Sequence, residues 1–209
     1  INWVEAADHF VCRAAHDVEL SRFSDFEDDP RVEQTLAAMS HQTMAHLAWR
    51  FRKWYLSKRL LSSIAAPPLR DIVEQMKTTP SLGASERRPF VMYSCHDITI
   101  LGLLYGLGAD FLSSDKDAEW RFFWPTYGTT LAFELVRIED DTPDSASHVV
   151  RVLLNGKPVL SVDFDKERGT GAYVGNGPEK MLSINDFELL VSRLEEAGGH
   201  DYATLLGYK

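Results

Sequence analysis

The stretch Phe-Val-Met-Tyr-Ser-Cys-His-Asp-Ile-Thr-Ile-Leu-Gly-Leu-Leu-Tyr-Gly-Leu (residues 90–107) decides the fold, because its character changes once along its length. Residues 90–94 form a short apolar run, which is typical of a buried strand. From residue 98 to 107, apolar side chains fall on nearly every side of a helix, which predicts a helix packed between layers. His96 and Asp97 stand where the strand gives way to the helix. We therefore expect a strand–helix unit of an α/β protein with a polar pair at its junction.

Upstream, the first eighty residues predict helices. Asn2 is a plausible N-cap for the first helix. Asp29-Pro30 offers an N-cap and a first-turn proline, and the apolar spacing after it predicts one long helix or two joined ones. Pro67-Pro68 is expected to break this helix, with a short helix after it. Residues 79–89 read as a loop, because prolines, a glycine and polar residues interrupt every period.

Downstream, alternating apolar residues at 130–137 predict a strand. Two further apolar runs, 149–154 and 157–160, flank Asn155-Gly156, a pair that favours the positive φ values of a tight hairpin turn. Ser183 begins a last helix of helical apolar spacing.

The order of these elements suggests a domain organisation. A helical block cannot make a sheet, and the strand–helix unit after it needs one. We therefore expect a helical cap portion, residues 1–80, followed by part of an α/β core, residues 81–209. No internal repeat is present.

Composition narrows the function classes. The 209 residues carry a formal net charge of -9, which disfavours a nucleic-acid partner but leaves room for a small phosphorylated substrate in a local cationic pocket. No apolar run is long enough to predict a transmembrane segment. The two cysteines, Cys12 and Cys95, provide neither a disulfide framework nor a four-ligand zinc site. We expect no metal and no cofactor.

His96 and Asp97 are the residues that could carry chemistry. A helix N-terminus presents free N–H groups and partial positive charge, which suit a phosphate. His96 can donate a hydrogen bond to an anion, and Asp97 can pass a proton to a leaving oxygen. A plainer interpretation is that Asp97 only caps the helix and that His96 is an interior histidine. The residues alone leave both interpretations open.

Residues 92–104 closely resemble the segment around the His-Asp pair of the histidine acid phosphatases. Weaker resemblances follow in the family's order. Residues 124–135 resemble its Pro-Pro-Tyr-Ala/Gly-Ser strand, 150–158 its next hairpin and 182–187 its closing helix, while residues 9–16 resemble a cap helix. The resemblance implies a phosphoglycerate-mutase-like three-layer α/β core, present in part, with a mainly helical cap.

The resemblance also implies a mechanism. In that family the histidine of an Arg-His-Gly-x-Arg-x-Pro motif attacks phosphorus and forms a phosphohistidine, while arginines clamp the phosphate. Only the phosphate ligand and the proton donor carry over here, to His96 and Asp97. No arginine of the chain is directly followed by a histidine. We therefore expect the nucleophile on an N-terminal segment of the same protein, upstream of Ile1, and no turnover by this chain alone.

Two other hypotheses stay open. The chain could be a degenerate or shed, non-catalytic family member that acts as a binding module, or a different α/β binding domain that shares only the strand-His-Asp-helix layout. Family members are often secreted, lysosomal or membrane-anchored, but no Asn-x-Ser/Thr sequon supports that here.

Some members of the family bridge a cap-helix cysteine to one near the Pro-Tyr-Ala-Ser strand. Cys12 matches the first position, but Thr129 or Thr130 stands at the second, so we expect Cys12 to lack that partner. Cys95 is expected to be a small buried residue.

The remaining candidates favour ordinary roles. His41 and His46 are five residues apart and point to different faces of a helix, so they do not predict a metal pair. A basic cluster could face an anionic substrate or membrane headgroups, but it favours a solvated helix face. The glycine-rich stretch 169–177 predicts a loop, and the acidic stretch 163–167 predicts a polar hairpin end. The basic cluster is Arg50, Arg52, Lys53, Lys58 and Arg59.

Overall fold

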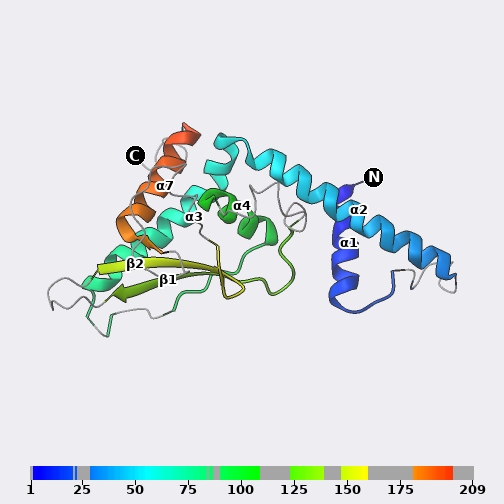
Figure 1. The fold of residues 1–209 in the computed structure, drawn as a ribbon, viewed down its shortest axis with the longest axis horizontal. Helices are drawn as coiled ribbons and strands as arrows, with labels where there is room; N and C mark the ends of the chain where they lie inside the picture. Colours follow the sequence, from blue (N-terminus) through cyan, green and yellow to red (C-terminus); the bar gives the residue numbers. More distant parts are fainter. Residues whose placement is uncertain are drawn as a thin grey trace.

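The computed structural model describes residues 2–20, 22, 29–83, 85–86, 90–108, 123–138, 147–159 and 181–199 (Figure 1). The chain is a mixed α/β protein, as the sequence predicts. Its helices are α1 (Trp3–Ala15), α2 (Pro30–Tyr55), α3 (Lys58–Thr78), the short 3-10 turn Thr79–Ser81, α4 (Asp97–Leu107) and α7 (Ile184–Gly198). Its strands are β1 (Leu131–Ile138), β2 (Ser147–Leu154), β3 (Lys157–Pro158) and β4 (Leu182–Ser183).

The helix starts follow the predicted capping residues. The Asn2 side chain accepts a hydrogen bond from the Val4 N–H at 3.1 Å. Asp29 accepts one from the Arg31 N–H at 2.9 Å, with Pro30 in the first helical position. These contacts satisfy N–H groups that have no partner inside the helix.

The predicted break at Pro67-Pro68 is wrong. Both prolines lie inside α3, and the boundary falls earlier, at Ser57, whose hydroxyl caps α3 by accepting from the Leu60 N–H at 3.4 Å. A proline within a helix costs about 3 kcal/mol. Here the helix continues because the face that follows the prolines, which includes Leu69 and Val73, is completely buried.

The core is built where α3 meets α4 and α7 (Figure 1). At the α3–α4 contact the backbones come so close that a Cβ on Gly106 would lie 2.8 Å from the Ala65 Cβ. Only glycine fits α4 at this point without displacing α3.

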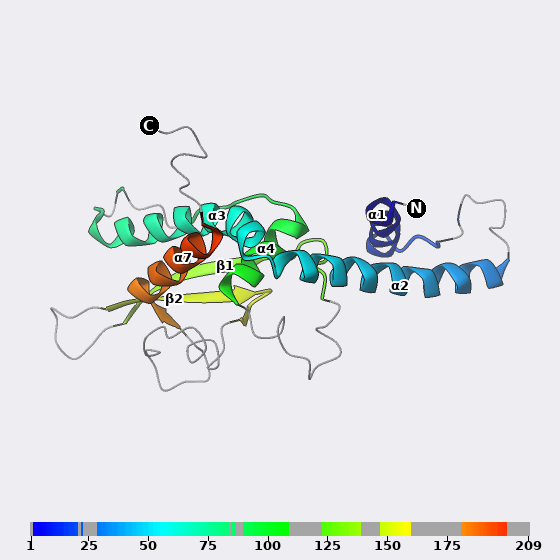
Figure 2. The ribbon, with the colours of Figure 1, turned by 90° about the horizontal axis from the view of Figure 1, so that it is seen from above.

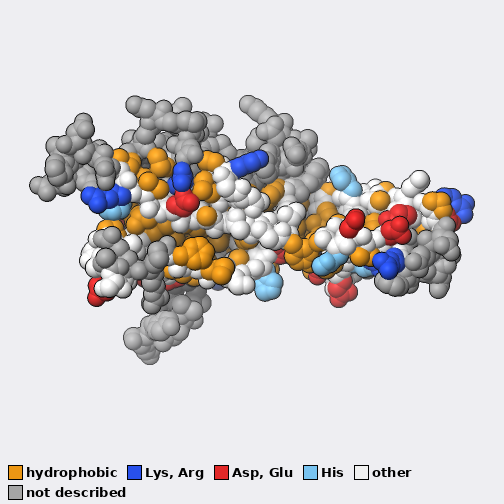
Figure 3. Space-filling model, turned by 90° about the horizontal axis from the view of Figure 1, so that it is seen from below, with side chains coloured by type: hydrophobic (Ala, Val, Ile, Leu, Met, Phe, Trp, Pro, Cys, Tyr) orange, Lys and Arg blue, Asp and Glu red, His pale blue; other side chains and the backbone are white. Residues whose placement is uncertain are grey.

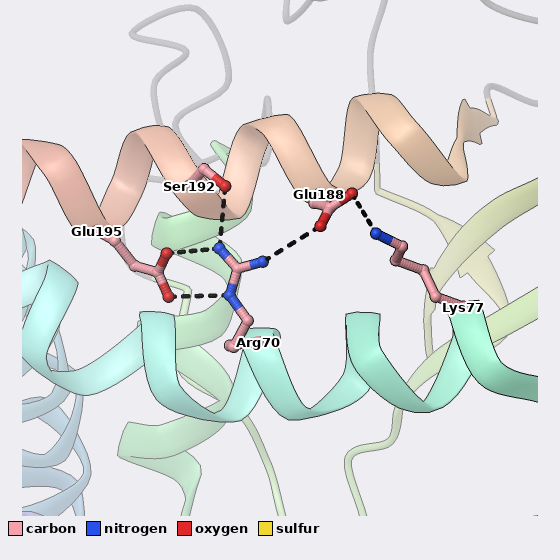
Figure 4. A network of polar contacts seen from close by, with 5 residues as sticks. All are labelled: Arg70, Lys77, Glu188, Ser192 and Glu195. Atoms are coloured by element: carbon pink, nitrogen blue, oxygen red, sulfur yellow. Dashed lines mark hydrogen bonds and ion pairs between the residues drawn. The ribbon is translucent and has the colours of Figure 1, made fainter. Parts of the chain in front are cut away.

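Ion pairs join α3 to α7 at the edge of this core (Figure 4). The Arg70 guanidinium donates to both carboxylate oxygens of Glu195 and to the Ser192 hydroxyl. Glu188 bridges Arg70 and Lys77, and the Lys77 Nζ lies 2.7 Å from its carboxylate. The planar fork of arginine therefore aligns two helices that are far apart in sequence.

The described strands form an antiparallel sheet in the order β1-β2-β3, with β4 also paired to β2. The predicted hairpin turn is confirmed, since Asn155 and Gly156 have φ values of 49° and 78°. Helix α7 packs on this sheet through Phe187, whose buried ring stacks against Phe133 on β1 at 5.9 Å.

Helices α1 and α2 extend away from this core (Figures 1 and 2). The C-terminal end of α2 joins the core, while its N-terminal half projects beyond it with α1 alongside. The Trp3 and His46 rings, 4.8 Å apart, mark the α1–α2 contact. None of the described helices combines the length and apolar character needed to cross a membrane.

The predicted buried strand at residues 90–94 is also wrong. The segment has no strand partner in the described part of the chain, and Phe90 and Met92 are 77% and 78% exposed. Tyr93 anchors it to α3, because its hydroxyl donates to Asp71. A strand needs neighbours for its backbone groups, and the described residues provide none here. Exposed apolar side chains gather on the left part of the surface seen from below (Figure 3).

Candidate functional site

His96 and Asp97 lie at the N-terminal end of α4. His96 is the N-cap residue, and its carbonyl oxygen accepts hydrogen bonds from the Thr99 and Ile100 N–H groups at 3.0 and 3.3 Å. Its side chain is exposed to solvent rather than interior. The backbone of His96 therefore starts the helix, while its imidazole stays available to a ligand.

Asp97 is the first helical residue and does not act as the N-cap. Both of its carboxylate oxygens accept a hydrogen bond from a neutral N–H group. The Ile98 backbone N–H donates to Oδ1 at 2.7 Å, and the Trp124 indole Nε1–H donates to Oδ2 at 2.8 Å. Two donors from different segments fix the plane of this half-buried carboxyl group.

This helix end has fewer free backbone N–H groups than the sequence predicts. The N–H of Ile98 donates to Asp97 and that of Thr99 donates to the His96 carbonyl. Any anion bound here would therefore rely on the His96 imidazole and the partial positive charge of the helix end more than on several backbone donors.

An aromatic group from α2 supports the Asp97 side chain. The Phe51 ring packs edge-on against Trp124, with centroids 5.2 Å apart and an interplanar angle of 72°. One turn further on, the Tyr55 hydroxyl donates to the Ile98 carbonyl at 2.9 Å. Helix α2 thus contacts both the indole that binds Asp97 and the residue that follows Asp97.

Two tyrosines, the buried Tyr55 and the partly buried Tyr105, keep neutral hydroxyl groups near this site. Burial is the main cause that raises the pKa of Tyr55 to about 12, and the negative charge of Asp97 adds to it. Burial likewise raises the pKa of Tyr105 to about 12, and its ring lies 5.2 Å from that of Tyr55. Tyr55 therefore remains a hydrogen-bond donor at any ordinary pH.

Helix α1 reaches the site at Tyr127. The Cys12 Sγ and the Tyr127 hydroxyl lie 3.1 Å apart. This hydrogen bond is the main cause that raises the pKa of Tyr127, and the charge of Asp97 is a smaller cause. Cys12 is a free, exposed cysteine in the structure. Cys95, predicted to be buried, is exposed beside His96, because the segment that carries it is not part of a sheet in the described residues.

The other candidates do not join the site. His46 stacks with Trp3 and Trp49 on the α1–α2 pair, and no group of metal-ligating side chains occurs among the residues that the structure describes. Of the basic cluster, Arg50 lies over the Trp54 ring at 5.0 Å. The stretches 163–167 and 169–177 lie outside the described residues.

Sequence reasoning missed the residues that hold Asp97. Trp124 stands at the start of the segment that resembles a family strand, and Phe51 and Tyr55 lie in the predicted helical block, so no pattern singles them out. The one usable signal was Trp124 itself, because an indole N–H that is not fully exposed usually finds an acceptor.

Comparison with known protein families identifies the family of this chain. A family model described as the histidine phosphatase superfamily (branch 2) matches residues 7–155, a range that includes Asp97, Trp124 and Tyr127. Comparison with curated proteins and with solved structures finds no significant match.

Proposed function

Because the chain belongs to branch 2 of the histidine phosphatase superfamily, we propose that its full-length protein is an acid phosphatase that hydrolyses phosphate monoesters through a phosphohistidine. Asp97 is the proton donor and His96 is a phosphate ligand. Membership of the superfamily itself supports a phosphatase-like function in general. The observation that carries the finer proposal is the Asp97 carboxyl, held by two N–H donors beside the exposed imidazole of His96.

The proposed reaction assigns one task to each residue. A histidine on the N-terminal segment attacks phosphorus, and the bond from phosphorus to the ester oxygen breaks. The Asp97 carboxyl group gives its proton to that departing oxygen. His96 donates a hydrogen bond to an oxygen of the phosphoryl group, whose charge the helix end also favours. Water then hydrolyses the phosphohistidine, with Asp97 taking up the proton that the water loses.

The unpaired segment at residues 90–94 supports the N-terminal segment as the missing partner. Its backbone groups make no ladder with the described residues, and its apolar side chains are exposed on both sides. An extended segment of this kind takes an added strand readily. A strand that pairs here would bring its C-terminal or N-terminal end next to His96, where a nucleophile is needed. The chain 1–209 alone is therefore expected to show no turnover.

Asp97→Asn in the full-length protein tests the proposal. A general acid contributes roughly 10²- to 10⁴-fold, and mainly where the leaving group is a poor one. We expect kcat on an alkyl phosphate to fall by about 100-fold or more, and kcat on p-nitrophenyl phosphate to fall much less.

Asp29→Asn is the matched control, because asparagine caps a helix as well as aspartate does and Asp29 lies at the far end of α2. Equal losses on both substrates would refute Asp97 as the proton donor. A full-length protein that binds phosphate esters but turns over neither substrate would instead favour the non-catalytic binding module.

A further inference from the structure

We propose that Trp124 is a positioning residue for proton transfer, whose indole N–H holds the Asp97 carboxyl in the orientation needed to protonate the leaving group. The inference rests on the proposed function of Asp97. It names a residue, outside the His-Asp pair, on which that function depends.

The contact is specific to one oxygen. Asp97 Oδ1 is held by the N–H of the next residue, which moves with the Asp97 backbone. Oδ2 receives its hydrogen bond from Trp124, 27 residues away in sequence. Among the described residues, Asp97 without the indole N–H would keep only a local donor, and its carboxyl group could rotate about its last bond. Within that part of the chain, the Trp124 contact is therefore the one that ties the carboxyl group to a distant segment.

The indole is itself held in place. Phe51 packs edge-on against its ring, and the ring is only partly exposed. Tyr55 stands one turn from Phe51 on α2, and its hydroxyl binds the Ile98 carbonyl. Helix α2 therefore fixes both the backbone beside Asp97 and the donor to its side chain. Such a support shell is what keeps a reacting group within a narrow range of positions.

The proton balance explains why an N–H donor is suited to this place. As the P–O bond breaks, its electron pair stays on the departing oxygen. That oxygen takes the proton from the Asp97 carboxyl group, which becomes a carboxylate. The N–H groups of Trp124 and Ile98 donate to that carboxylate and stabilise the charge as it forms. Tryptophan has a donor and no acceptor, so it cannot accept the proton in place of the leaving group.

Trp124→Phe in the full-length protein tests the inference, because it keeps an aromatic ring and removes the N–H. We expect kcat on an alkyl phosphate to fall about tenfold, with kcat on p-nitrophenyl phosphate changed less than about threefold and KM little changed on either. In the Asp97→Asn background the same change should add no further selectivity, because the acid that Trp124 positions is already gone.

Trp49→Phe is the matched control, since Trp49 is 50% exposed on α2 and its ring packs on His46. If Trp124→Phe does not fold, as judged by circular dichroism, benzothienylalanine at position 124 keeps the size of the indole and replaces its N–H by sulfur. The same selective loss is expected from that substitution.

The outcomes separate the two proposals. Equal losses on both substrates, or no loss, from the folded Trp124 variant would overturn the positioning role while Asp97→Asn still shows its leaving-group dependence. If Asp97→Asn itself lacks that dependence, the proposed function fails and the inference fails with it.

Discussion

Gly106→Ala tests whether α3 and α4 really meet at backbone distance. A Cβ at position 106 would lie 2.8 Å from the Ala65 Cβ and 3.3 Å from the Leu194 Cδ2. Carbon atoms pack best at about 3.5 to 4.0 Å, so α4 would have to move away from α3 by roughly 1 Å. Since the obstacle is a Cβ bonded to the α3 backbone, no side-chain rotation can relieve it.

Two effects of opposite sign determine how much Gly106→Ala changes the free energy of unfolding. Overpacking a buried contact costs about 1 to 3 kcal/mol. Replacing glycine by alanine inside a helix returns up to about 1 kcal/mol of helix propensity. We therefore expect Gly106→Ala to lower the free energy of unfolding by about 1 to 2 kcal/mol. For a protein of this size that corresponds to a drop in Tm of about 2 to 8 °C.

Thermal and urea unfolding of the protein measure this effect, with a double-mutant cycle as the decisive step. Ala65→Gly removes the obstructing methyl, so the double variant should be more stable than the sum of the two single changes predicts. Gly83→Ala is the control, because the Cβ added there meets only the Glu86 Oε2 at 3.5 Å, an ordinary van der Waals distance. An unchanged or higher Tm for Gly106→Ala, or additivity within about 0.5 kcal/mol, would refute the close contact.

Three further predictions concern stability. Arg70→Met should lower the free energy of unfolding by about 1 to 3 kcal/mol, because Glu195 then loses its bidentate partner; Arg70→Lys should recover only part of this in urea unfolding. Gly156→Ala should lower Tm, because φ at this position is 78°, where a side chain is strained. The free energy of unfolding should fall as pH rises from 10 to 12, because burial raises the pKa of Tyr55 and Tyr105 to about 12 and the unfolded chain loses these protons first. In urea unfolding, the double variant Tyr55→Phe/Tyr105→Phe should show a weaker dependence on pH.

The sequence predicted the features that depend on neighbouring residues. Asn2 and Asp29 accept from N–H groups two residues away, and Asn155-Gly156 adopts its turn from its own backbone preferences. Local chemistry of this kind is visible in a single sequence.

The predictions from sequence are wrong where an element far away in the chain determines the local structure. Pro67-Pro68 should end a helix by local rules, but burial against α4 and α7 keeps α3 intact. Residues 90–94 have the composition of a buried strand, yet a strand forms only where a neighbouring strand is present. Neither partner can be inferred from the segment itself.

The candidate site likewise has a part that the sequence predicts and a part that it does not. His96 and Asp97 are adjacent, and their place at a helix start follows from the residues around them. One donor to Asp97 is local, the N–H of Ile98. The other contacts come from far along the chain, since Trp124 is 27 residues from Asp97 and Tyr55 is 43 residues from Ile98. A sequence pattern could point to Asp97 as the proposed acid, but not to Trp124 as its distant hydrogen-bond donor.

The contact between α3 and α7 also affects how the protein is made. Arg70 and Glu195 are 125 residues apart, so α3 leaves the ribosome long before the helix that covers it. At roughly 5 to 20 residues per second, this delay is about 6 to 25 s. During that interval the apolar face that includes Leu69 and Val73 has no α7 to cover it. We expect a nascent chain in this state to bind chaperones, and the yield of folded protein to depend on translation speed as well as on the stability of the final fold.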